Sequence, residues 1–340
     1  MRPKIRYIHL GLCFGICSTV AHADHPTIAF GSESAGAINT ISATPLPVGA
    51  WGFGLRSEII TNDEFSTEQL QNFAASGQEG VHSTDQITST SLSLSYGITE
   101  DLSLSLRLPY IQRKNIRESE LEDGVPEAHT LGDSSGVGDL LLLGQYRVLA
   151  RKDTDVSILF GIKVPTGETR EKDNGGIRFE TEFQPGTGSW DFLLGAAISK
   201  NVGQMSYHAN ILYNKTTPGS QSTKLGDAFS YNVGLSYRLN EPHDTQDHDH
   251  RHESISATLH SAFNWDLSLE LNGETRRPDK IFGISEINSG ATTVFLSPGV
   301  RVSAGKFSGF ISYGLPLVEN QKGQQTDISN RIVAGLSIAL

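Results

Sequence analysis

The densest group of metal-ligating side chains in the sequence is a short histidine-rich segment, residues 241–253. It reads EPHDTQDHDHRHE and alternates imidazoles with carboxylates: His243, His248, His250 and His252, with Asp247, Asp249 and Glu253. Imidazole and carboxylate ligands together suit Zn²⁺, Cu²⁺ or Ni²⁺. Spacing by two is looser than in a fixed structural site. The segment therefore predicts either a solvated polar turn or weak, exchangeable metal binding.

A second group has the residue types of a hydrolase. Ser206, His208 and Asn210 occupy alternate positions, so they share one face of a strand. A hydrolase needs its nucleophile within hydrogen-bond reach of its base. An enzyme acting on bilayer lipid would also need this set on the apolar face, and Tyr207 and Ile211 occupy that face. We therefore predict that the chain is not an enzyme and has no cofactor.

Along most of the chain, charged and other polar residues alternate with apolar residues, so that in a strand the charged side chains would share the face opposite the apolar one. If the strands close into a barrel, as argued below, this face lines the lumen. Charges of both signs there either pair into a structural network or line a polar pathway, and both hypotheses stay open. The predicted lumen-lining residues are Arg56, Arg107, Asp139, Arg147, Lys163, Asp191, His208, Arg238, Glu270 and Arg301.

The elements that position these residues are β-strands, because the apolar pattern has period two. In residues 154–164, Val156, Ile158 and Phe160 face one way, whereas Ser157 and Lys163 face the other. About twelve such segments follow one another from residue 51 to the last residue, each long enough to cross a membrane as a tilted strand. We predict an all-β fold, a closed antiparallel transmembrane β-barrel, since only a closed sheet leaves no unpaired backbone in lipid.

The connections between these segments alternate between short and long, as in outer-membrane barrels. Short turns are predicted to be periplasmic and long loops extracellular. The histidine-rich segment occupies a periplasmic position. The predicted long loops are 61–85, 113–136, 166–185, 216–226, 273–290 and 314–327.

The N-terminus predicts export. Basic Arg2, Lys4 and Arg6 precede an apolar run that ends at the cleavage motif Ala21-His22-Ala23. We expect a cleaved signal peptide at 1–23, an irregular arm at 24–48 and the barrel at 49–340. Both cysteines lie in the signal peptide, which excludes thiol chemistry from the mature chain. The formal net charge of −11 argues against a nucleic-acid partner.

Several motifs resemble a family of Gram-negative outer-membrane transporters of the phenol-degradation meta-pathway type. They are ESAGAINTISATPLPVGAW (33–51), GVGDLLLLGQYRVL (136–149), GIKVPTGE (161–168) and QPGTGSWDFLLGAAISK (184–200). The resemblance implies an outer-membrane channel associated with aromatic-compound catabolism. The histidine-rich segment is not part of the family pattern and favours a metal-linked context.

Two hypotheses follow. The first is an outer-membrane channel for passive transport of small molecules, including hydrophobic or aromatic compounds, with the bilayer, lipopolysaccharide and a small solute as partners. The second is a plugged structural or metal-binding barrel linked to metal homeostasis, with Zn²⁺, Cu²⁺ or Ni²⁺ at the histidine-rich turn. The arm is long enough to fill the lumen, so the pattern alone does not choose between them.

Overall fold

The computed structural model describes residues 37–240 and 263–340. The predicted signal peptide, the first part of the arm and the histidine-rich segment with His243, His248, His250 and His252 lie outside the described residues. Within them, a closed antiparallel barrel of twelve strands confirms the predicted fold class. No described helix is long and apolar enough to cross a membrane.

The barrel strands are 11 to 21 residues long, as a tilted crossing requires. In chain order they are β1 (Trp51–Asp63), β3 (Gln86–Gly97), β4 (Leu102–Glu122), β6 (Leu140–Arg151), β7 (Thr154–Val164), β8 (Asp191–Val202), β9 (Met205–Lys215), β11 (Ala228–Arg238), β12 (Asn264–Arg276), β15 (Ala291–Ala304), β16 (Phe307–Gln321) and β17 (Asp327–Ala339).

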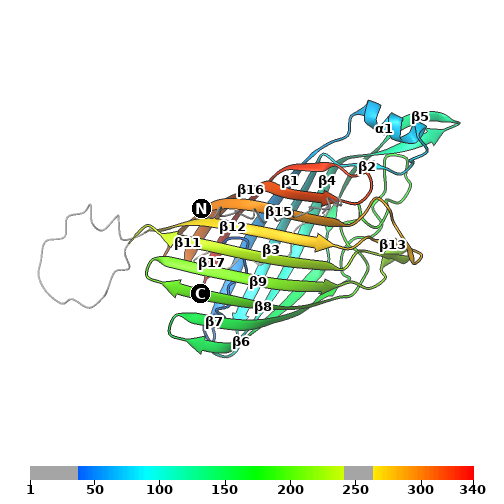
Figure 1. The fold of residues 1–340 in the computed structure, drawn as a ribbon. Helices are drawn as coiled ribbons and strands as arrows, with labels where there is room; N and C mark the ends of the chain where they lie inside the picture. The colour runs from blue at the N-terminus through cyan, green and yellow to red at the C-terminus, as the bar shows by residue number, and fades with distance from the viewer. Residues whose placement is uncertain (1–36, 241–262) are drawn as a thin grey trace, which may run out of the picture.

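Each strand pairs with the next, and β1 closes the barrel by pairing with β17 from Gly52↔Ala339 to Asp63↔Asp327. The turns after β3, β6, β8 and β15 are short and lie at one end of the barrel, which we call the short-turn end (Figure 1). The ends of β11 and β12 that residues 239–263 connect also lie at the short-turn end, and the opposite end, the long-loop end, carries the remaining connections. This alternation is the one that the sequence predicted.

The long-loop end differs from the sequence expectation most in two places, and β12 and β16 also continue to Arg276 and Gln321, into the predicted loops 273–290 and 314–327. The predicted loop 113–136 is mostly strand, because β4 continues to Glu122 and pairs with β5 (Val125–Val137) in a hairpin that projects beyond the barrel (Figure 1). The predicted loop 61–85 contains the helix α1 (Thr67–Ala75) and the short strand β2 (His82–Ser83). Ser66 and Gln69 form a capping box that starts α1.

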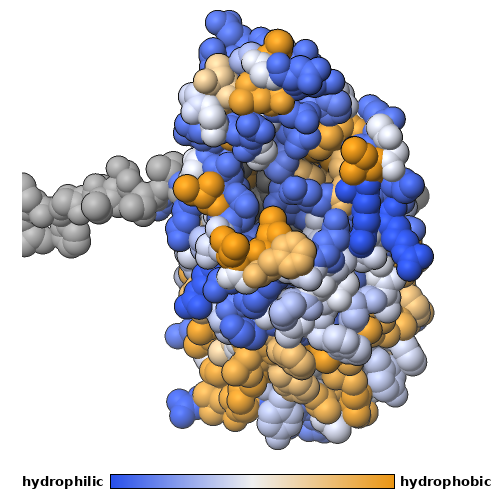
Figure 2. All heavy atoms as spheres, turned by 90° about the vertical axis from the view of Figure 1, so that its right-hand side faces the viewer, coloured by the Kyte–Doolittle hydropathy of each residue, from blue (hydrophilic) through white to orange (hydrophobic). Residues whose placement is uncertain are grey.

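Small elements complete the long-loop end. A 3₁₀ turn, η1 (Ser220–Ser222), precedes a three-stranded sheet made of β10 (Thr223–Lys224), β13 (Lys280–Ile281) and β14 (Ile284–Ser285). Figure 2 views the molecule from this end, where hydrophilic surface predominates and hydrophobic surface shows in the lower part of the picture. Polar groups thus gather where the loops meet water.

The two faces of the barrel wall differ sharply in exposure. On β8, Asp191 and Leu193 are 1% and 4% exposed, whereas the alternating Phe192 and Leu194 are 52% and 63% exposed. The same alternation on β12 buries Glu270 and exposes Leu269. An apolar outer belt around a polar interior is the arrangement that a hydrocarbon surround requires.

Candidate functional site

The predicted lumen-lining residues all lie at shielded positions, nine of them on strands and Asp139 in the break between β5 and β6. Seven are buried, namely Arg56, Arg107, Asp139, Asp191, His208, Glu270 and Arg301, and three are half-buried, namely Arg147, Lys163 and Arg238. They do not form one line along the lumen. The structure separates them into ion pairs near the short-turn end, a group around the arm and a group around a pocket.

The ion pairs lie where β-strands meet the short turns. Arg147 contacts Asp101 at 2.9 Å and Asp155 at 3.5 Å, and Arg238 donates two hydrogen bonds to Asp266 at 2.9 and 3.2 Å. Each guanidinium joins adjacent strands through carboxylates. These pairs are a structural network, one of the two roles expected for lumen charges.

The second group holds the arm inside the lumen. One carboxylate, that of Glu270 on β12, accepts hydrogen bonds from Ile38 N (2.7 Å), Asn39 N (3.0 Å), Thr40 N (2.8 Å) and Thr40 Oγ1 (2.7 Å). Arg56 donates to Ile38 O and Asn39 Oδ1. Opposite charges on the wall therefore satisfy donors and acceptors of an irregular backbone that would otherwise be buried unpaired.

Part of the predicted group of Ser206, His208 and Asn210 takes part in hydrogen bonds that hold the arm. Asn210 Oδ1 accepts from Ile41 N at 2.9 Å, and His208 Nδ1 lies 2.8 Å from the hydroxyl of Ser199 on the neighbouring strand. That hydroxyl in turn accepts from Ala43 N at 2.8 Å. The hydroxyl that contacts the imidazole is thus Ser199 and not Ser206, and it is 2% exposed.

Apolar residues close the lumen around the arm. Ile41 and Ala43 pack with inward-facing wall residues in one buried cluster, which we call the apolar floor: Ile41, Ala43, Leu141, Leu143, Leu159, Leu193, Ala197 and Leu212. The cluster joins the arm to β6, β7, β8 and β9. The arm is therefore anchored by burial of apolar surface as well as by hydrogen bonds.

Beyond the apolar floor, toward the long-loop end, the lumen contains a pocket of about 130 Å³. Leu141 and Leu193 belong both to its wall and to the apolar floor. Its apolar lining is completed by Pro109, Ile111, Pro185 and Leu225. Its polar lining includes Arg107, Arg113, Asp139, Lys163, Thr187, Asp191, Asn214 and Arg276.

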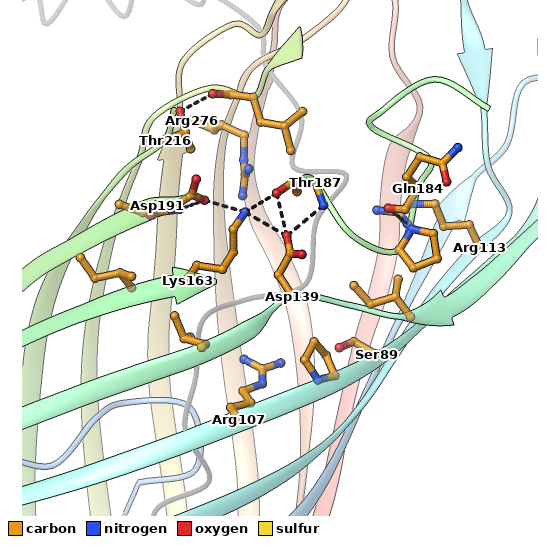
Figure 3. A pocket seen from close by; sticks show the side chains of 17 residues that line it. Ser89, Arg107, Arg113, Asp139, Lys163, Gln184, Thr187, Asp191, Thr216 and Arg276 are labelled. Atoms are coloured by element: carbon orange, nitrogen blue, oxygen red, sulfur yellow. Dashed lines mark hydrogen bonds and ion pairs between the residues drawn. The ribbon is translucent and has the colours of Figure 1, made fainter. Parts of the chain in front are cut away.

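One polar network lines a side of this pocket (Figure 3). Lys163 Nζ lies 2.7 Å from Asp191 Oδ2 and 3.4 Å from Asp139 Oδ2, and it donates to Thr187 Oγ1 at 2.7 Å. The hydroxyl and backbone N–H of Thr187 both donate to Asp139, at 2.7 and 2.9 Å. One ammonium group thus contacts two carboxylates, and hydroxyl and carboxylate groups lie at the edge of an apolar space.

The network depends on a close approach of three backbone segments. A side chain on Gly167 would lie 2.7 Å from the backbone of both Gly138 and Gly186, and one on Gly186 would lie 2.5 Å from the carbonyl carbon of Gly167. We call this contact the three-glycine junction. It fixes the inner loop, residues 165–190, against the break between β5 and β6, so that Gln184, Pro185 and Thr187 reach the pocket.

Sequence reasoning missed two parts of the site. The apolar floor breaks the polar pattern of the inner face, and its signal is continuous leucine at 140–143 and 193–194, where alternation would place a polar residue. The inner loop was expected to be a simple extracellular loop. Its signal is the recurrence of glycine in the three motifs at 136–138, 165–168 and 184–188.

Comparison with known proteins agrees with this architecture. An outer membrane channel from Pseudomonas putida F1 aligns with 88% of this chain and 98% of its own at a TM-score of 0.58 and 18% identity. A weaker likeness, with a TM-score of 0.42 and 10% identity, joins 92% of this chain to 98% of a TodX mutant described as a monoaromatic hydrocarbon channel. No curated protein matches the sequence.

The first of these likenesses shows the fold of an outer-membrane barrel, and the apolar belt places this chain in the outer membrane. A family model described as "Putative MetA-pathway of phenol degradation" matches residues 78–273, more than half of the chain. That range includes three of the four motifs on which the resemblance rested. The chain therefore belongs to the MetA-pathway phenol-degradation family.

Proposed function

We propose that the protein is a passive outer-membrane channel whose pocket accepts an uncharged solute of about one aromatic ring with one polar group. The observation that carries this proposal is the pocket of about 130 Å³. A cavity of roughly 150 Å³ in a protein core holds one benzene molecule. The description of the family, phenol degradation, supports the same class of solute.

The lining of the pocket explains the preference for a ring with a hydroxyl. Leu141, Leu193 and Ile111 offer apolar contact to the faces of a ring. Asp139 and Thr187 offer hydrogen-bond partners at the edge, and Lys163 pairs with both Asp139 and Asp191. A fully charged solute would need a further partner in this pocket, because a buried charge without a partner is costly.

Passage beyond the pocket involves the arm. Leu141 and Leu193 separate the pocket from Ile41 and Ala43, which fill the lumen below it. A solute that enters from the long-loop end therefore reaches the pocket first and leaves toward the periplasm when the arm moves aside. The outer belt contacts lipid, with lipopolysaccharide around the long-loop end. The metal-homeostasis hypothesis gains no support from the family match or from the fold.

Two neighbouring leucines on β8 provide a matched test. Leu193 faces the pocket and is 4% exposed, whereas Leu194 faces lipid and is 63% exposed. Leu193→Trp fills the pocket, and Leu194→Trp adds the same indole outside. In cells of a Gram-negative host that lacks the protein, we expect micromolar [¹⁴C]phenol uptake to rise with wild type and Leu194→Trp but not with Leu193→Trp. Equal uptake by both variants, or by wild type and empty vector, would contradict the proposal.

A further inference from the structure

A compact histidine–carboxylate cluster lies at the long-loop end, outside the lumen pocket. His82 on β2 pairs with Glu118 on the projecting part of β4. Its Nε2 lies 3.2 Å from Glu118 Oε2, and its Nδ1 lies 3.2 Å from Glu182 Oε1 on the inner loop. The imidazole thus joins the β2–β4 wall to the inner loop.

The ligand atoms of this cluster have the separations of a transition-metal site. One ligand atom each from His82, Glu180 and Glu182 lies within 4.8 Å of the other two. In a tetrahedral zinc site with ligand distances of about 2.0 Å, neighbouring ligand atoms are about 3.3 Å apart. The 3.2 Å between His82 Nδ1 and Glu182 Oε1 matches that edge.

Glu118 provides the carboxylate that commonly orients a metal-ligating histidine. A ligating histidine usually donates its other ring N–H to a carboxylate, which fixes the tautomer and the ring orientation. Glu118 is placed for that role on the Nε2 side, opposite the side on which Glu182 lies. The ring is also held edge-on against Phe183, with centroids 4.7 Å apart.

Charge favours a cation at this point. Three carboxylates, those of Glu118, Glu180 and Glu182, lie around the single imidazole of His82. The cluster thus concentrates more negative charge than one imidazolium neutralises. Mixed imidazole and carboxylate donors suit Zn²⁺ and its neighbours in the transition series better than Ca²⁺ or Mg²⁺, which prefer oxygen ligands alone.

We propose that His82, Glu180 and Glu182 bind a divalent transition-metal ion of the Zn²⁺ class, with Glu118 orienting the imidazole. The ion joins β2 to the inner loop two residues before Gln184, which lines the pocket. Phe183, between them, is held by Ser134, whose hydroxyl donates to its carbonyl at 2.6 Å. Bound metal therefore fixes the inner loop and with it one wall of the pocket. This second consequence rests on the proposed function, whereas binding itself does not.

The test is isothermal titration of the detergent-solubilised full chain with ZnCl₂, at pH 7.5. His243, His248, His250 and His252 are replaced by Asn in every sample, so that the histidine-rich segment contributes no ligands. We expect Zn²⁺ affinity to fall at least tenfold with His82→Asn and with Glu182→Gln, and roughly tenfold with Glu118→Gln. Ca²⁺ and Mg²⁺ should not compete.

A second histidine on the same projection is the control. His129 on β5 is exposed and lies 3.7 Å from Glu120, so His129→Asn should leave Zn²⁺ affinity unchanged. Heat-modifiable migration on gels verifies that each variant is folded. Zn²⁺ affinity unaffected by His82→Asn, or no heat at micromolar Zn²⁺ in the parent, would overturn the site. If Zn²⁺ binds but does not change phenol uptake, only the claim that the metal fixes one wall of the pocket is overturned.

Discussion

At the scale of single residues, Glu270 is the wall residue that accepts several hydrogen bonds from the arm. It is 1% exposed and accepts hydrogen bonds from three consecutive backbone N–H groups of the arm. When several consecutive N–H groups donate to one carboxylate, the carboxylate fixes the conformation of the backbone around it. The arm therefore takes an irregular path without leaving its donors unpaired.

Removal of this carboxylate should release the arm. Glu270→Ala deletes four hydrogen bonds to a charged acceptor, each contributing about 1.5–3 kcal/mol. We expect amide hydrogens of residues 38–40 to exchange at least ~10-fold faster in hydrogen-exchange mass spectrometry of the detergent-solubilised protein. Glu270→Gln should give a smaller increase, because its amide oxygen still accepts.

The control for this prediction is another buried lumen acid. Asp266 lies on the same strand but pairs with Arg238, so Asp266→Asn should leave exchange at residues 38–40 unchanged. If both variants accelerated exchange equally, the effect would come from general loss of barrel stability. The arm would then not depend on Glu270 in particular.

Residue type and alternation predict which charged residues lie on the inner face of the wall, and in the structure the predicted residues are buried or half-buried. Arg56, Glu270 and Arg301 could be placed on the inner face because an alternating strand offers only two faces. Their partners could not be predicted, since the contacts of Glu270 with residues 38–40 span more than 200 positions in the sequence. Only the folded path of the arm brings them together.

At the scale of elements, the three-glycine junction sets the position of the inner loop. Gly186→Ala would place a methyl group 2.5 Å from backbone atoms, which cannot move as a flexible side chain can. We expect a cost of about 1–3 kcal/mol, localised to the inner loop. Tryptic cleavage after Arg170, Lys172 and Arg178 in the folded barrel should therefore become faster.

A glycine in the same loop provides the comparison. Gly175 meets only the side chain of Asp173, at 3.3 Å, so Gly175→Ala should leave the cleavage rate close to that of wild type. If Gly186→Ala were cleaved no faster than Gly175→Ala, the close approach of the three segments would not hold the loop.

Another element-scale prediction concerns Glu319, at the end of β16 beyond the part that pairs with β17. Burial raises the pKa of the Glu319 carboxyl to about 7, and the nearby Asp327 and Asp63 add to the effect against the hydrogen bond from Ile328 N. A carboxyl with a raised pKa stabilises the fold in its protonated form. Its contribution is complete below its unfolded value, near pH 4.5, and is lost as pH rises through about 7.

Glu319→Gln should remove this dependence. Solvent screening of a half-exposed group limits the effect to less than about 1 kcal/mol. Relative to wild type, the variant should melt at the same temperature at pH 4.5 and up to ~2 °C higher at pH 8.5, as followed by loss of the heat-modifiable form. Glu127→Gln, on the exposed β4–β5 hairpin, is the control. A constant difference at both pH values would contradict the assignment.

The elements at the long-loop end were the hardest to predict from sequence. Residues 113–136 contain acids and glycines, and charged residues on both parities obscure period two where a hairpin leaves the membrane for water. The sequence contains the capping-box residues of α1, Ser66 and Gln69, but the helix is only nine residues long and gives little helical periodicity. Short amphipathic patterns between two strands are weak signals.

At the scale of the whole molecule, the pattern of exposure follows from closing the sheet. Twelve strands that alternate leucine, isoleucine or valine with polar residues can hide every backbone group from lipid only as a barrel. This part of the fold could be predicted because the pattern is repeated along most of the chain. The occupancy of the lumen could not, since the arm has no periodicity and residues 37–43 are held mostly by strands more than 100 positions away.

In the proposed channel the arm limits how far a solute can travel, so its removal is the most direct test at this scale. In the structure, residues 37–43 are nearly all buried between β11, β12 and β15 on one side and β7 and β8 on the other. Deletion of residues 24–46, with the predicted signal peptide 1–23 retained, removes Ile41 and Ala43 from the apolar floor. The pocket should then continue toward the short-turn end.

We expect this deletion to raise single-channel conductance in planar bilayers several-fold over wild type, because ionic current through a narrow lumen is limited by its most occluded part. Deletion of residues 241–253 is the control, since that segment follows the last strand position of β11 at the short-turn end and should leave conductance unchanged. Phenol uptake should rise with the first deletion and lose its dependence on Leu193. Wild-type conductance in the arm deletion would mean that the wall alone closes the lumen.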